Sequence, residues 1–166
     1  MGERCARCGV DRGELSIGEA ADMIERFGPE YRDVVAGVGV GSPRLRARPA
    51  PEVWSPLEYL VHVRDLIRYH GWLANRTLTQ DRPEVPAPDP DAITANEAYN
   101  DADPSEVLDG IAQQSLRFAG RAREFSGTDL DRVAIRAGTP VSVRFMVTNV
   151  AHEGHHHLLD VQWLLA

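Results

Sequence analysis

Residues 151–160, AHEGHHHLLD, decide how this chain of 166 residues is interpreted, because they hold four of its six histidines. A histidine run near a chain end is often a purification tag, but here apolar residues follow in helical register through Trp163. Residues four apart on a helix share one face, separated by about 6 Å along the axis. His152 and His156 have this spacing, which is one at which paired imidazoles bind metal ions.

The stripe of the last helix that carries His152 and His156 is largely apolar, so both imidazoles are expected to face inward. Its other members are Phe145, Thr148, Asn149, Leu159 and Trp163. Buried imidazoles need partners, which leaves either a hydrogen-bonded structural pair or a metal site. His155 and His157 lie about 100° to either side of His156 and are expected at the helix margins or in solvent. Of these two, His155 is kept as an additional candidate ligand.

Four segments carry apolar residues at helical spacing and predict four long helices. They are residues 16–38, 55–78, 103–125 and 141–166. Ser16 with Glu19 matches a capping box, and Ser55 before Pro56 matches an N-cap followed by proline. Gly28-Pro29 predicts a kink or break in the first helix. Four such helices predict an all-α four-helix bundle.

The segments between the helices differ in length and composition. They are a Gly- and Pro-containing loop at 37–51, a proline-rich connection at 81–92, a short helix at 92–100, and an extended stretch at 129–135 followed by a turn at 138–140. A long proline-rich connection and a short extended segment before the last helix are therefore expected. Residues 1–15 are predicted to form a cysteine-containing tail or knuckle, and residues 16–166 the bundle.

A third metal ligand should come from another helix. His62 lies within WSPLEYLVHVRD, residues 54–65, and shares a stripe with Leu66, Tyr69 and Leu73 that should face inward. The alternative is an ordinary core histidine. His70 falls on a different face of the same helix and is expected to be peripheral.

The pattern W-S-x-x-E-Y-x-x-H-V-R-D at 54–65, followed by H-E-x-x-H-H-L-x-D at 152–160, resembles the DinB-like (YfiT-like) metalloenzyme superfamily. The similarity is strongest to its actinobacterial branch, which includes mycothiol-dependent maleylpyruvate isomerase and thiol S-transferases. The resemblance covers about residues 16–166.

This resemblance implies a bundle in up-down-down-up order with a divalent metal held by His62, His152 and His156. Zinc is the expected ion, with nickel as the alternative. Three imidazoles leave a coordination position open, which is typical of catalytic sites. The implied activity is transfer of a low-molecular-weight thiol, of the mycothiol or bacillithiol type, to a small electrophile; some relatives are hydrolases. A metal-binding histidine usually donates its second N–H to an outer partner, for which Glu58 and Asp160 are the candidates.

Cys5 and Cys8 resemble half of a zinc knuckle, and no second CxxC motif exists in the sequence. Three interpretations are open: a weakly structured tail, a redox pair, or a half-site that borrows ligands from the histidine cluster or a second chain. If the cysteines fold over the bundle, they close the open metal position. The function is then that of a non-enzymatic metal-binding or stress-response protein with a closed zinc site.

The formal net charge of −7 opposes binding to nucleic acid and to anionic membranes, because both require a basic face. No apolar run approaches the roughly 20 residues that span a bilayer, and the start of the chain lacks an apolar signal segment. A cytoplasmic protein with a small-molecule substrate is expected. A homodimer is a further expectation, since small bundles often form one.

Overall fold

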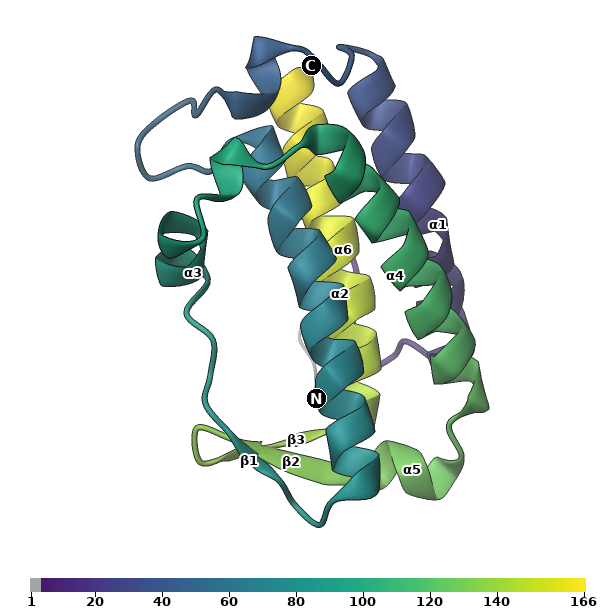
Figure 1. Ribbon diagram of the computed structural model, residues 1–166. Helices are drawn as coiled ribbons and strands as arrows, with labels where there is room; N and C mark the ends of the chain where they lie inside the picture. The colour runs from purple at the N-terminus through teal and green to yellow at the C-terminus, as the bar shows by residue number, and fades with distance from the viewer. Residues whose placement is uncertain (1–3) are drawn as a thin grey trace.

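The computed structural model describes residues 4–166, so the first three residues of the predicted tail lie outside it. Its frame is four long helices: α1 (Ile17–Ala36), α2 (Pro56–Thr79), α4 (Pro104–Glu124) and α6 (Val143–Leu165). Helices α1 and α6 run in one direction and α2 and α4 in the other (Figure 1). Both α1 and α2 pack against α4 and α6, so the four helices enclose one core. The predicted up-down-down-up bundle is confirmed.

Each long helix begins at a polar residue whose side chain accepts a hydrogen bond from a backbone N–H of the first turn. These residues are Ser16, Ser55, Asp103 and Ser142. Such caps satisfy backbone donors that have no partner within the helix, and each contributes about 1 kcal/mol. The predicted break at Gly28-Pro29 is absent, because α1 continues through Pro29. The bare Gly28 backbone lies against Ala112 of α4, where an added Cβ would stand 2.9 Å from the Ala112 Cβ.

The connections between the long helices carry the rest of the secondary structure. They hold the short helices η1 (Pro43–Arg46), α3 (Pro90–Asn96), η2 (Tyr99–Asp101) and α5 (Gly127–Asp131), and the strands β1 (Glu84–Val85), β2 (Val133–Arg136) and β3 (Thr139–Ser142). The extended stretch expected from residue 129 begins only at Val133, because Ser126 and Asp129 form a capping box that starts α5.

A three-stranded sheet closes one end of the bundle and is the departure from a purely helical fold. Strand β2 pairs in parallel with β1 and antiparallel with β3. Strand β1 belongs to the proline-rich connection. Its pairing with β2 therefore holds the connection near the C-terminal end of α2. From there the chain runs back along the side of α2 to α3 near the other end (Figure 1).

The rotation of α6 about its axis is fixed by its contact with α1. An added Cβ on Gly154 would stand 2.2 Å from Phe27 Cε2, so only glycine fits there. Tyr31 of α1 also donates a hydrogen bond from its hydroxyl to the Gly154 carbonyl, at 2.7 Å. Gly154 lies about 160–200° around the helix from His152 and from His156. The histidine stripe therefore faces away from α1.

The two imidazoles of the α6 stripe are half-buried at the margin of the bundle, contrary to the prediction that they face inward, whereas Thr148 and Asn149 of the same stripe are buried. The apolar core face of α6 is formed by Met146, Val147, Val150, Ala151, Leu158 and Val161. Trp163, at the end of the stripe, is 66% exposed. No helix within residues 4–166 combines the length and apolar character needed to cross a membrane.

Replacing Gly154 by alanine is expected to destabilise the fold by about 1–3 kcal/mol, because the new methyl group overpacks against the buried Phe27 ring. Gly120→Ala is the matched control. It lies in α4, and a Cβ added there would meet no atom within 4 Å, so the substitution should stabilise the helix by about 0.5–1 kcal/mol. Urea unfolding measures both, and equal midpoints for the two variants would contradict this packing.

Candidate metal centre

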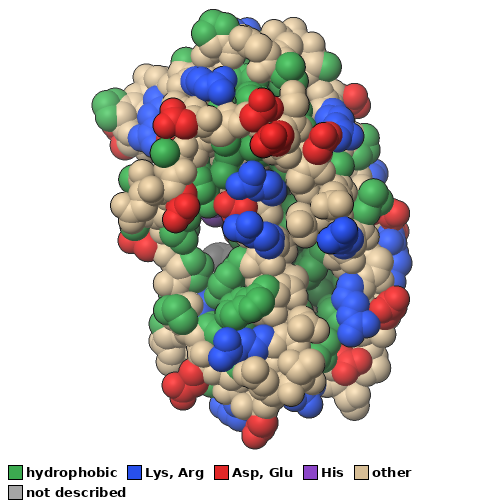
Figure 2. Space-filling view, in the orientation of Figure 1, with side chains coloured by type: hydrophobic (Ala, Val, Ile, Leu, Met, Phe, Trp, Pro, Cys, Tyr) green, Lys and Arg blue, Asp and Glu red, His purple; other side chains and the backbone are tan. Residues whose placement is uncertain are grey.

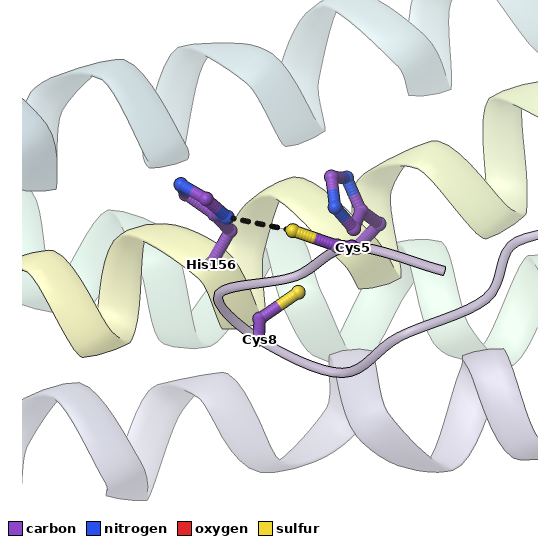
Figure 3. A group of neighbouring side chains, drawn as sticks. Cys5, Cys8 and His156 are labelled. Atoms are coloured by element: carbon purple, nitrogen blue, oxygen red, sulfur yellow. Dashed lines mark hydrogen bonds between the residues drawn. The ribbon is translucent and has the colours of Figure 1, made fainter. Parts of the chain in front are cut away.

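The N-terminal segment before α1 forms a compact turn around its two cysteines. The backbone N–H of Cys5 donates to the Val10 carbonyl at 2.9 Å, and that of Gly9 donates to the Cys5 carbonyl at 2.8 Å. Gly9 has φ +74°, a conformation that costs glycine little. Both thiols lie on the side of the turn that faces α6 (Figure 3).

Two arginines fasten this segment along α6. Arg7 forms an ion pair with Asp160 at 2.5 Å, and Arg12 donates to the Asn149 side-chain carbonyl at 2.6 Å. The Arg12 guanidinium also stacks over the Phe145 ring, 5.5 Å from its centre. The two attachment points on α6, Asn149 and Asp160, bracket the histidine pair.

Four potential metal ligands meet between these attachments. One ligand atom from each of Cys5, Cys8, His152 and His156 lies within 4.8 Å of the other three, and all four residues are half-buried. Cys5 Sγ lies 3.5 Å from His156 Nδ1 (Figure 3). Around tetrahedral zinc, bonds of about 2.0–2.3 Å place neighbouring ligand atoms about 3.3–3.8 Å apart. The Cys5–His156 distance falls within this range, and two sulfurs with two imidazoles are a donor set that suits a zinc ion.

The two thiols differ in acidity. The backbone N–H of Cys8, the His152 side chain and the backbone N–H of Arg7 hold the pKa of Cys5 at about 5. Burial, and the negative charge on Cys5, raise the pKa of Cys8. One thiolate is thus present at neutral pH, and a cation held there would supply positive charge that stabilises the second thiolate. Thiolates are the form in which cysteine binds metal.

Carboxylates lie near both histidines, and one of them is at hydrogen-bond distance. His152 Nδ1 lies 2.9 Å from Glu153 Oε1, which leaves Nε2 available for an ion. His156 turns Nδ1 toward Cys5, and its Nε2 is 3.9 Å from Asp160. Glu153 was not among the sequence candidates, although its position directly after His152 was the available signal. Asp160 was a candidate, and it also bonds His157 Nδ1 at 2.8 Å.

Glu58, the other predicted orienting residue, has different partners. Its two carboxylate oxygens bind Arg48 at 2.6 and 2.8 Å, and the Ser55 N–H at 2.8 Å. Burial alone raises the pKa of a carboxyl, but the Arg48 guanidinium and the Ser55 N–H outweigh it and lower the pKa of Glu58. In this structure Glu58 caps the start of α2.

His62 lies outside the four-ligand group, so its role as a ligand stays a prediction. Its ring packs against Trp54 and His157, each with ring centres 5.1 Å apart. Burial, and then the nearby His157, lower the pKa of His62 to about 4. His62 is therefore neutral at pH 7, the form in which imidazole binds metal.

His157 and His70 are more buried than the sequence predicted. The His157 side chain is 14% exposed, less than the 24% of His156, because α2 covers it with Tyr59 and His62. His70, expected to be peripheral, is 2% exposed. His155 is half-buried and is not a member of the ligand group.

A cavity of about 950 Å³ lies beside the metal centre, between α2, the connection that carries α3, and α6. Figure 2 shows its opening as a hollow bordered by hydrophobic and arginine side chains. His62 and Glu153 both contribute to its wall. Because Glu153 also bonds His152, one carboxylate joins the cavity to the ligand group.

Comparisons with known proteins agree with this architecture. The sequence profile of the DinB superfamily matches residues 39–161. Among solved structures, the chain is similar to YfiT from Bacillus subtilis, described as a probable metal-dependent hydrolase with an unusual four-helix bundle topology. That similarity has a TM-score of 0.81 at 16% identity, and covers 91% of this chain and 88% of YfiT. No curated protein matches the chain at a significant level.

Purified protein loaded with zinc is expected to hold one equivalent, and Cys8→Ser and His156→Ala are each expected to lose it to a mild chelator. Both changes remove a member of the four-ligand group. His155→Ala is the matched control on the same helix and should keep the metal. Elemental analysis after chelator dialysis measures the content. Retention of one equivalent by Cys8→Ser, together with loss in His62→Ala, would favour the three-histidine site instead.

Proposed function

The chain belongs to the DinB superfamily, and we propose that it is a zinc-binding member whose ion is held by Cys5, Cys8, His152 and His156. The ion is enclosed by four protein ligands and joins the N-terminal segment to α6. The proposed function is that of a metal-binding or stress-response protein with a closed zinc site.

One observation carries this proposal: four ligand atoms from two segments about 150 residues apart converge within 4.8 Å. Long-range interactions hold them together before any ion binds, since Arg7 and Arg12 pair with α6 on either side. Two cysteines and two histidines brought together in this way form a donor set that is typical of structural zinc sites. The acidic Cys5 adds a thiolate that is ready to bind.

The donor set favours zinc over nickel. Two sulfurs and two imidazole nitrogens are a common ligand set of structural zinc sites, which are four-coordinate and tetrahedral. Nickel(II) is associated with tetragonal sites of nitrogen and oxygen donors. A bound zinc ion would supply positive charge and four strong bonds, and much of its binding free energy would contribute to folding.

A closed site has a different consequence from the three-histidine site that the sequence resemblance implied. With all four positions taken by protein atoms, no position remains for water or a substrate. The protein residues around the ion then position its four ligands. Glu153 orients the His152 imidazole, Asp160 lies 3.9 Å from His156 Nε2, and the turn at residues 5–10 presents both sulfurs.

A second candidate function is favoured by the cavity beside the ligand group. In it, the protein is a metal-dependent enzyme that transfers a low-molecular-weight thiol, such as mycothiol, to a small electrophile, or is a hydrolase, as YfiT is described. The cavity wall includes His62 and Glu153, and Glu153 bonds a member of the ligand group. Only the Glu153 side chain would then separate a small molecule in this cavity from the ligand His152.

Removal of zinc separates the two candidates. If the ion is structural, chelation should lower the melting temperature and zinc should restore it. At a free zinc concentration 1,000 times the dissociation constant, binding stabilises the native state by about 4 kcal/mol. A Cys5→Ser/Cys8→Ser double variant should melt at the lower temperature with or without zinc, whereas His155→Ala should respond as the unmodified protein does.

Activity measurements complete this comparison. Consumption of mycothiol with a chloronitrobenzene electrophile, and hydrolysis of a nitrophenyl ester, are each followed with and without zinc. The closed-site proposal predicts no zinc-dependent turnover of either. Zinc-dependent turnover, in a protein whose melting temperature does not respond to chelation, would overturn the closed site and support the enzyme.

A further inference from the structure

Two consecutive residues of α2, Tyr69 and His70, carry buried polar atoms and have ring centres 5.3 Å apart. The Tyr69 hydroxyl and His70 Nε2 are both buried and have no hydrogen-bond partner within residues 4–166. Both residues contribute to the wall of the large cavity. Buried polar atoms in folded proteins nearly always have partners. Two such atoms at one cavity wall are therefore groups that a ligand could satisfy.

The His70 ring has a defined tautomer. Its Nδ1 lies 3.0 Å from the Leu66 carbonyl oxygen, and a carbonyl can only accept, so Nδ1 carries the proton. Nε2 then has a free lone pair and acts as an acceptor. Burial lowers the pKa of His70 to about 4, which keeps the ring neutral at pH 7. The matching group on a ligand is a donor such as a hydroxyl.

Arg136, at the end of β2, places a positive charge in the same wall. It is half-buried, and within residues 4–166 no carboxylate lies at salt-bridge distance from it. Burial raises the pKa of Tyr69, and the adjacent Arg136 guanidinium opposes this effect. The guanidinium therefore lies close enough to the Tyr69 hydroxyl to act on it directly. The phenol keeps its own O–H, so a ligand carboxylate at this point could accept from both groups.

Of the other charges of the wall, Asp65, Arg68 and Glu153 are engaged with neighbouring residues, whereas Glu97 lies exposed. Asp65 is bound by Arg64 at 2.9 Å and by the Tyr99 hydroxyl at 2.9 Å, and Glu153 is bound to His152. The intervening wall is apolar and includes Leu66, Trp72, Pro88 and Ile93. Trp72 is 47% exposed, so its ring can contact a flat ligand. The volume of about 950 Å³ is in the range of small-molecule sites.

We propose that this cavity binds a small hydroxylated organic acid with a flat apolar body. The carboxylate accepts from Arg136 and the Tyr69 hydroxyl, and the ligand hydroxyl donates to His70 Nε2. The apolar body lies against Leu66 and Trp72. This site goes beyond the proposed zinc function and does not depend on it, because none of its residues belongs to the four-ligand group.

Calorimetric titration of the full-length, zinc-loaded protein tests the proposal with three probes: 3-hydroxybenzoate, benzoate and phenol. We expect 3-hydroxybenzoate to bind at least about tenfold more tightly than either probe that carries only one of its polar groups. Arg136→Gln should weaken binding of both acids at least tenfold and leave phenol unchanged. Arg117→Gln, on the surface of α4, is the matched control and should bind all three probes as the unmodified protein does.

The proposed hydrogen bond from the ligand hydroxyl to His70 Nε2 is tested separately. His70→Phe keeps a ring but removes the acceptor, so the preference for 3-hydroxybenzoate over benzoate should disappear. Tyr69→Phe removes one hydroxyl and should weaken both acids, which keeps the test decisive if His70→Phe does not fold. The proposal is overturned if 3-hydroxybenzoate shows no saturable binding at millimolar concentration, or if Arg136→Gln binds it unchanged. It is equally overturned if a structure at saturating 3-hydroxybenzoate shows only water on His70 Nε2.

Discussion

The close contact between Phe27 of α1 and Gly154 of α6 is the constraint on which the metal centre depends. Because residue 154 has no side chain, the Phe27 ring reaches the α6 backbone, and Tyr31 bonds the Gly154 carbonyl. These contacts set which face of α6 is buried. His152 and His156, on nearly the opposite side of the helix, are left at the bundle margin, where the N-terminal segment can reach them.

The N-terminal segment supplies the other two residues of the four-ligand group, Cys5 and Cys8. Its two cysteines lie on one turn, and its two arginines pair with α6 at residues 149 and 160, on either side of the histidine pair. Distant parts of the chain thus meet through these polar contacts, while Leu15, just before α1, packs against the core. An ion bound by both segments would couple the segment to the bundle, which is how structural metal sites contribute to folding.

The sequence was sufficient to predict the features that depend on a single helix. Apolar periodicity located the four long helices, capping residues located the starts of α1 and α2, and the four-residue spacing paired His152 with His156. The sequence was insufficient to predict contacts between elements that are distant in the chain. The meeting of Cys5 and Cys8 with α6 depends on Arg7 and Asp160, which are far apart in the chain. His70 lies on a face of α2 that periodicity leaves peripheral, yet it is buried in the structure, where β2 also packs on that helix.

X-ray absorption at the zinc edge, on protein loaded with one equivalent, tests the four-ligand centre most directly. The predicted result is two sulfur ligands at about 2.3 Å and two nitrogen ligands at about 2.0–2.1 Å, with the sulfur lost in Cys5→Ser/Cys8→Ser. A shell of nitrogen and oxygen alone in the unmodified protein, as three imidazoles and a water would give, contradicts the account.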